Sequence, residues 1–221
     1  MEKLNFSDCD LTQADSIFKL IPLRSTPFLT NWVETNFELT DFDKKRTQNL
    51  SEIIDQNHLH WNDAEFARHA IGPMFAFIDF TEHYRFNFFA RGAIAATVDN
   101  IALSGKIDAL ITTGFRAPEV PFFVFTQWKK ETNGYVHPAG ETLAGMLAAQ
   151  VLNETNTTSE PIYGAYCIGS DWYFMTLQSR KYAISQCFCS TQYEQALQIF
   201  RILSQLKVYC MERTAHIVVE G

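Results

Sequence analysis

The feature that most constrains the fold is a series of strand-like segments followed by an alanine-rich helix. Three short apolar runs are typical of β-strands: Ala93–Leu103, Lys106–Thr113 and Phe122–Trp128. The next segment, Thr142–Asn153, is rich in alanine, and its small side chains would let a helix lie close against a sheet. Strands that lead into such a helix predict a mixed fold with helices packed on a central sheet.

Cap and breaker residues predict further helices on both sides of this stretch. The first sixty residues are predicted to be helical, with helix starts near Thr12, Thr26 and Thr40. Another helix is predicted over Trp61–Ile71 and should end at Gly72, which is followed by a proline. The other predicted elements are strands at Tyr84–Ala90, Ile162–Ile168, Trp172–Leu177 and Tyr182–Phe188, a turn at Ser104–Gly105, and a long final helix that begins at a capping box, Thr191–Glu194.

The organisation of the chain indicates one domain. It contains no internal repeat, low-complexity tract or long linker, and its 221 residues suffice for one sizeable core. We therefore expect a single domain over residues 1–221, with a helical extension (1–60), a core (61–190) and a C-terminal helix and tail (191–221). The expected fold class is α/β (α+β), with a central mixed β-sheet flanked by helices.

Charge and hydropathy limit the partners and the compartment. The formal net charge is −7, which argues against the broad basic surface typical of tight nucleic-acid binders but is compatible with a local basic cleft. No apolar run is long enough to cross a bilayer, and the N-terminus lacks the features of a signal peptide. Five cysteines without a Cys-x-x-Cys pair are typical of thiols in a reducing compartment. We expect a cytoplasmic protein with no membrane partner.

Three polar residues on two of the predicted strands are candidates for chemistry. Strand alternation places Ile107 and Ala109 on one face and Asp108 on the opposite face. On the following strand, Gln127 and Lys129 share a face by the same period. A carboxylate and a Gln-x-Lys pair on neighbouring strands are therefore expected to converge.

This set of residue types suits the hydrolysis of phosphodiester bonds. A carboxylate and a second oxygen ligand can hold Mg²⁺, which prefers oxygen donors and keeps several waters. The metal lowers the pKa of a bound water and stabilises negative charge on the phosphoryl oxygens. A nearby lysine can orient the attacking water or neutralise charge in the transition state.

The segments Gly105–Ile111, Phe122–Lys130 and Leu143–Asn153 together resemble the core of the PD-(D/E)xK nuclease superfamily, the restriction-endonuclease-like fold. The resemblance extends over roughly residues 60–190. It implies a helix before a β-meander, a second helix that crosses over the sheet, and a fourth strand that closes it. It also implies that Asp108 is the first metal-binding aspartate and that Lys129 is the motif lysine.

The sequence departs from the family pattern at the motif acid. Gln127 stands where the family normally has Asp or Glu; its amide oxygen can ligate a cation but adds no charge, so metal affinity should fall. Many members take a further acid from the first core helix, and the resemblance assigns that role to Glu65. The implied catalytic residues are thus Asp108, Gln127 and Lys129, and the implied Mg²⁺ ligands are Asp108, Gln127 and Glu65.

Asp108, Lys129 and Glu65 each also have a structural explanation. Asp108 could be a strand-end residue satisfied by backbone N–H groups, Lys129 a solvated strand end, and Glu65 an exposed helix residue. Three hypotheses about function therefore stay open. The first is a Mg²⁺-dependent DNA nuclease, and the second is a catalytically inactive nuclease-derived module that binds nucleic acid, a protein partner or a second copy of itself. The third is a structural accessory protein without nucleic-acid contact.

Overall fold

The computed structural model describes residues 2–82, 85–129, 137–154 and 160–216, with the backbone alone at 123–127 and 154. Its helical elements are η1 (Phe6–Asp8), α1 (Leu11–Phe18), α2 (Pro27–Val33), α3 (Asp41–Asn57), α4 (Asp63–Phe66), η2 (Ala67–Ile71), α5 (Gly72–Ile78), α6 (Pro138–Glu154) and α7 (Tyr193–Arg213). Its strands are β1 (Glu2–Asn5), β2 (Ile21–Leu23), β3 (Asn87–Val98), β4 (Ile101–Thr113), β5 (Glu119–Lys129), β6 (Ile162–Ile168), β7 (Asp171–Gln178), β8 (Lys181–Ile184) and β9 (Phe188–Cys189).

The strands form one mixed sheet in the order β1-β4-β5-β6-β7-β8-β2, with β3 beside β4 and β9 beside β7. β3, β4 and β5 are antiparallel neighbours, whereas β5 and β6 are parallel and are connected through α6. The prediction that Lys106–Thr113 and Phe122–Trp128 are neighbours in one mixed sheet is therefore confirmed. α6 packs against β5 and β6, as predicted for the alanine-rich segment.

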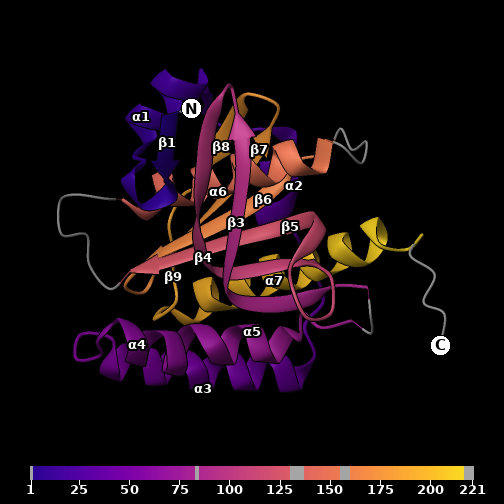
Figure 1. Cartoon of the computed structure of the whole chain (residues 1–221). Coiled ribbons are helices and arrows are strands. Elements are labelled where there is room, and N and C mark those ends of the chain that lie inside the picture. The colour runs from indigo at the N-terminus through magenta and orange to yellow at the C-terminus, as the bar shows by residue number, and fades with distance from the viewer. Residues whose placement is uncertain (1, 83–84, 130–136, 155–159, 217–221) are drawn as a thin grey trace.

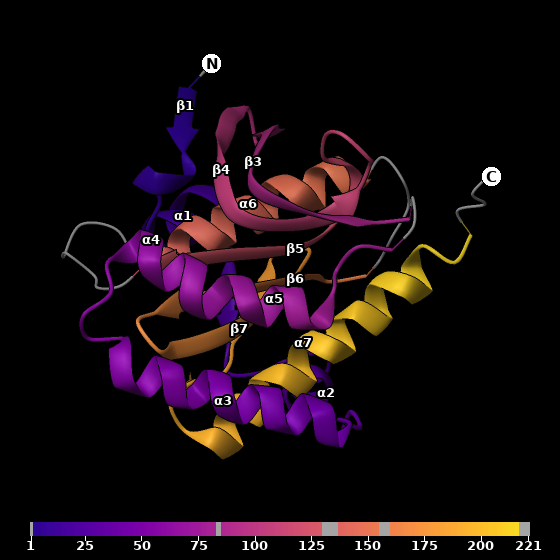
Figure 2. The same ribbon diagram turned by 90° about the horizontal axis from the view of Figure 1, so that it is seen from below.

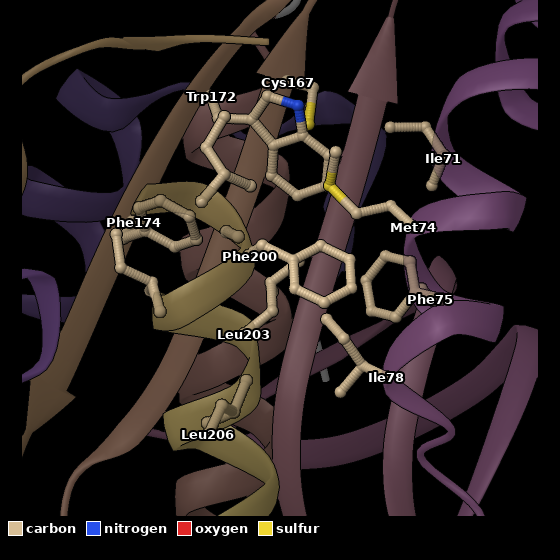
Figure 3. Close-up of a cluster of buried hydrophobic side chains, with 14 of the residues drawn as sticks. Ile71, Met74, Phe75, Ile78, Cys167, Trp172, Phe174, Phe200, Leu203 and Leu206 are labelled. Atoms are coloured by element: carbon tan, nitrogen blue, oxygen red, sulfur yellow. The ribbon is translucent and has the colours of Figure 1, made fainter. Parts of the chain in front are cut away.

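Helices cover both faces of the sheet (Figures 1 and 2). One apolar cluster joins α2, α3, α5 and α7 to one face, and a second joins α1 and α6 to the other. In the first cluster, side chains of α5 and α7 meet aromatic residues of β7, among them Trp172 and Phe174 (Figure 3). The expected fold class, a central mixed sheet flanked by helices, is confirmed. No helix within the described ranges has the length and apolarity needed to cross a bilayer.

The prediction that the first sixty residues are helical is wrong in part, because the short strands β1 and β2 lie among them. Glu2–Asn5 pairs in parallel with Ile101–Ser104, and Ile21–Leu23 pairs in parallel with Lys181–Ala183. Both short strands gain their hydrogen bonds from strands distant in the sequence, so local propensity alone could not predict them. The helix start predicted near Thr12 lies instead at Asp10, which forms a capping box.

The helix starts predicted near Thr26 and Thr40 are confirmed, because each threonine side chain caps a helix. The C-terminal helix begins as predicted after residue 191, but its N-cap is Gln192, which makes no side-chain capping bond. The predicted capping box Thr191–Glu194 is therefore wrong.

The turn predicted at Ser104–Gly105 is also wrong, because both residues lie inside β4. The chain turns at Asp99 and Asn100, which have φ values of 49° and 67°, a conformation that Asp and Asn tolerate in two-residue hairpin turns. Gly105 has a packing role instead. A Cβ at this position would lie 2.4 Å from the Phe6 ring, so only glycine lets η1 approach the strand so closely.

The helix predicted to end at Gly72 continues to Ile78. The N–H of Gly72 bonds to the carbonyl of Ala67, five residues back, which makes η2 a π-helical turn. A proline inside a helix clashes with the carbonyl four residues before it, and the widened turn accommodates Pro73. Gly72 and Pro73 therefore mark a distortion within the helix and not its end.

Candidate active-site cleft

A cleft of about 790 Å³ lies between the continuous helix α4–η2–α5 and the strands β3, β4 and β5. Its helical wall carries Asp63, Ala64, Ala67, Arg68, Ile71, Gly72 and Phe75, and its strand wall carries Phe88, Ala90, Arg91, Asp108, Trp128 and Lys129. π-Helical turns such as η2 occur frequently at functional sites. The sequence predictions Asp108 and Lys129 therefore lie in the same cleft.

Asp108 reaches the cleft through an irregularity in the β3–β4 ladder. The pairing runs from Ala90↔Ala109 to Gly92↔Ile107 in one register, but the facing residues Arg91, whose φ is 54°, and Asp108 are not paired. Ile107 consequently packs with the α6 side of the sheet and Ala109 with the α5 side. The prediction that Ile107 and Ala109 share a face is wrong, because regular alternation breaks at the position between them.

The carboxylate of Asp108 is half-buried and held in place. Its Oδ2 accepts a hydrogen bond of 3.3 Å from the backbone N–H of Trp128. Burial raises the pKa of the Asp108 carboxyl above its usual value, and the nearby negative charge of Glu141 adds to the rise. The Trp128 hydrogen bond and the positive charges of Arg91 and Lys129 oppose it. The ionised form of Asp108 is therefore less favourable here than in water, and positive charge nearby stabilises it.

Glu141, which the sequence analysis did not select, pairs with the predicted lysine. The Nζ of Lys129 lies 3.2 Å from Oε2 of Glu141, close enough for an ion pair but outside hydrogen-bond geometry. Glu141 is 6% exposed, and a buried carboxylate is unfavourable unless it is paired or bound to a cation. The α6 helix thus places a buried carboxylate against Lys129, and the negative charge of this carboxylate also acts on Asp108.

A weak signal for Glu141 is present in the sequence. It is the acidic residue in the first turn of α6, a helix otherwise rich in alanine and apolar residues. Acidic residues are common in the first turn because they interact favourably with the helix dipole. The ion pair of Glu141 with Lys129 depends on how α6 packs on the sheet, which the sequence does not give.

The remaining two predicted ligands are placed differently. The backbone pairing Ala109↔Thr126, continued by one residue, places Gln127 opposite Asp108, but the side chain of Gln127 falls outside the described part of the structure. Glu65 is exposed and completes the capping box of α4, where its Oε2 accepts a 2.9 Å hydrogen bond from the N–H of Asn62. Glu65 does not line the cleft, so the structure gives it a capping role and brings it to neither carboxylate.

The cleft carries more positive than negative side chains. Arg68, Arg91 and Lys129 line it together with Asp63 and Asp108, whereas the whole chain has 18 basic and 25 acidic residues. Arg68 and Arg91 are exposed, and neither has an ion pair or side-chain hydrogen bond within the described ranges. Because Glu141 offsets the charge of Lys129, the two exposed arginines are the side chains that suit an anionic ligand.

No protein-family model matches the chain, and a search of curated proteins found no match.

The raised pKa of Asp108 predicts that this residue lowers stability at neutral pH. Because its pKa is higher in the folded than in the unfolded chain, folding loses stability as pH rises from about 3.8 through the folded-state value. Asp108→Asn removes this penalty and keeps an oxygen for the Trp128 N–H. We therefore expect Asp108→Asn to melt at a higher temperature than wild type in EDTA, by a larger margin at pH 8 than at pH 4.5. A variant that is less stable than wild type at pH 8 would show that the carboxylate stabilises the fold.

Proposed function

We propose that this chain is a divergent metal-dependent nuclease of the PD-(D/E)xK type, which hydrolyses phosphodiester bonds in DNA. The observation that carries the proposal is a cleft lined by Asp108, Lys129 and two exposed arginines, with the buried Glu141 ion-paired to Lys129. The element order supports the same conclusion. A helix, a three-stranded meander, a helix that crosses over and a fourth, parallel strand follow one another from α4 to β6, as the resemblance implies.

The two carboxylates fit a divalent cation. Asp108 and Glu141 are close enough for the negative charge of one to raise the pKa of the other. Oε2 of Glu141 is buried and accepts no hydrogen bond within the described residues. A dication would relieve both unfavourable features, and oxygen donors are those that Mg²⁺ prefers. Among the described residues, no three His, Cys, Asp or Glu side chains lie close enough together to hold a metal ion. Water, substrate or Gln127 would therefore complete the coordination.

Glu141 can replace the acid that the motif lacks at Gln127. When bound, Mg²⁺ would supply a water of lowered pKa and stabilise charge on the phosphoryl oxygens. The residues of the chain hold the substrate and its charge. Lys129 keeps 30% of its side chain exposed, so its ammonium remains accessible to a phosphate oxygen from the cleft. Arg68 and Arg91 can bind neighbouring phosphates by paired hydrogen bonds.

Divalent-metal binding should depend on both carboxylates. We expect Mn²⁺ to bind Asp108→Asn and Glu141→Gln about tenfold to hundredfold more weakly than wild type, because each change removes one negative charge from the dication. Isothermal titration calorimetry measures this effect directly. Glu52→Gln, which removes an exposed carboxylate from α3, is the matched control and should bind as wild type does. Equal affinities in all four proteins would mean that Asp108 and Glu141 hold no metal.

The test of the nuclease proposal is cleavage of nucleic acid by the purified chain. Supercoiled plasmid and a 5′-labelled single-stranded oligonucleotide are incubated with Mg²⁺, with Mn²⁺ or with EDTA. Cleavage with either metal and none with EDTA is the expected result. The uncharged Gln127 favours the second hypothesis, a non-cutting module, which requires binding without cleavage under all conditions. Absence of both binding and cleavage would contradict the nuclease proposal and a non-cutting module that binds nucleic acid.

A further inference from the structure

We infer that the cleft takes unpaired nucleotides, so that the preferred ligand is a single-stranded polynucleotide rather than a duplex. This inference rests on the proposed function, because it assigns the substrate class of the same site. Three aromatic side chains, Phe75, Phe88 and Trp128, line the same cleft as Asp108. The scissile phosphate must reach Asp108, so the bases on either side of it are brought against these rings.

The rings suit bases that are not stacked on one another. Phe88 and Trp128 are half-buried and therefore keep part of their surface in the cleft, while Phe75 lies behind Phe88 with the ring centroids 5.3 Å apart. Aromatic side chains stack on bases only where the bases are unpaired or splayed apart. A duplex keeps its bases stacked internally and offers no base face to Phe88 or Trp128.

The size and charge of the site agree with a short single strand. A volume of about 790 Å³ is of the order that holds a small ligand, enough for a few atoms of backbone and one or two bases. Three cations line the cleft, Arg68, Arg91 and Lys129, whereas tight duplex binders commonly make 6–10 phosphate contacts. The net charge of −7 likewise argues against a broad duplex-binding face.

The test is fluorescence anisotropy with three labelled probes: a 12-nucleotide deoxythymidine strand, the uridine strand of the same length, and a 12-base-pair DNA duplex. Titrations are made in Ca²⁺ and repeated in EDTA, which prevents cleavage. We expect the single strand to bind about tenfold or more tightly than the duplex, a difference of the size that stacking on aromatic side chains produces. The two single strands distinguish DNA from RNA as the source of the ligand.

Variants locate the binding surface. Trp128→Leu and Phe88→Leu remove a stacking face but keep apolar volume, and each should weaken single-strand binding about tenfold while duplex binding changes little. Because both rings also pack on the core, Arg91→Gln provides a test that leaves the core intact. Arg91→Gln should weaken single-strand binding and reduce its salt slope by about one phosphate contact. Arg116→Gln, an exposed arginine outside the cleft, is the matched control and should bind as wild type does.

Two results would overturn the inference. One is a duplex that binds as tightly as the single strand, and the other is an Arg91→Gln protein that behaves like Arg116→Gln. Failure of the inference is distinguishable from failure of the proposed function. Metal-dependent cleavage with a preference for duplex overturns the substrate class alone, whereas tight single-strand binding without cleavage supports the substrate class and contradicts the nuclease.

Discussion

Asp108→Asn should lower the rate of metal-dependent DNA cleavage by about 10²–10³-fold. Asparagine keeps the shape of the side chain and an oxygen for the 3.3 Å hydrogen bond from Trp128, so the loss comes from the missing charge. Without that charge a dication is held less well beside the substrate phosphate. Glu141→Gln should reduce the rate comparably, because Glu141 supplies the second carboxylate of the site. Initial rates of plasmid nicking in Mg²⁺ and Mn²⁺ measure both effects.

The matched control for these rates is again Glu52→Gln, which should cleave at the wild-type rate. Circular dichroism and melting curves establish that each variant is folded before its rate is compared. An Asp108→Asn protein that is folded and cleaves at the wild-type rate would exclude Asp108 from the reaction. Loss of activity in Asp108→Asn with full activity in Glu141→Gln would leave Asp108 in the site and remove Glu141 from it.

Phe174→Ala should destabilise the fold by about 3–5 kcal/mol, as removal of a fully buried aromatic side chain does. Phe174 lies on β7 in the cluster of Figure 3 and is fully buried. It contacts the rings of Trp32, Trp172 and Phe188, at centroid distances of 5.1, 6.2 and 5.7 Å. Its removal leaves a cavity where α2, the sheet and β9 meet, and the melting temperature should fall by about 6–20 °C.

Phe42→Ala is the control for this measurement. Phe42 is 71% exposed on α3 and makes one cation–π contact, with Arg46, so the change should alter stability by no more than about 1 kcal/mol. Urea denaturation followed by tryptophan fluorescence gives both values. Equal midpoints for the two variants would mean that the aromatic cluster around Phe174 does not stabilise the sheet.

Much of the fold follows from local sequence patterns. The apolar strands β4 and β5 and the alanine-rich α6 were predicted because each carries its signal within its own residues. The errors arose where the packing or hydrogen bonding of a residue depends on a residue distant in the sequence. Gly105 was predicted to be a turn residue, but its lack of a side chain leaves room for the Phe6 ring. β1 forms because the N-terminal half of β4 provides its hydrogen-bond partners.

The candidate site was predictable only in part, for the same reason. Asp108 and Lys129 lie on neighbouring strands, as predicted, but they share the cleft although regular alternation in β4 breaks between Ile107 and Ala109. Glu141 comes from a helix that crosses over the sheet, and its place beside Lys129 depends on how α6 packs. Glu65 was assigned as a metal ligand from its position on the first core helix. In the structure its side chain forms a capping box with Asn62 instead. The roles of Asp108, Gln127 and Lys129 in catalysis stay predictions.

We propose that Asp108 and Glu141 together hold one divalent metal ion. Anomalous diffraction from a crystal of the protein soaked in Mn²⁺ would locate that ion. The expected result is one anomalous peak at coordination distance, about 2 Å, from a carboxylate oxygen of Asp108 and from one of Glu141. A fully occupied peak elsewhere, or no peak at this position at millimolar Mn²⁺, with Glu141 still paired only to Lys129, would contradict the claim.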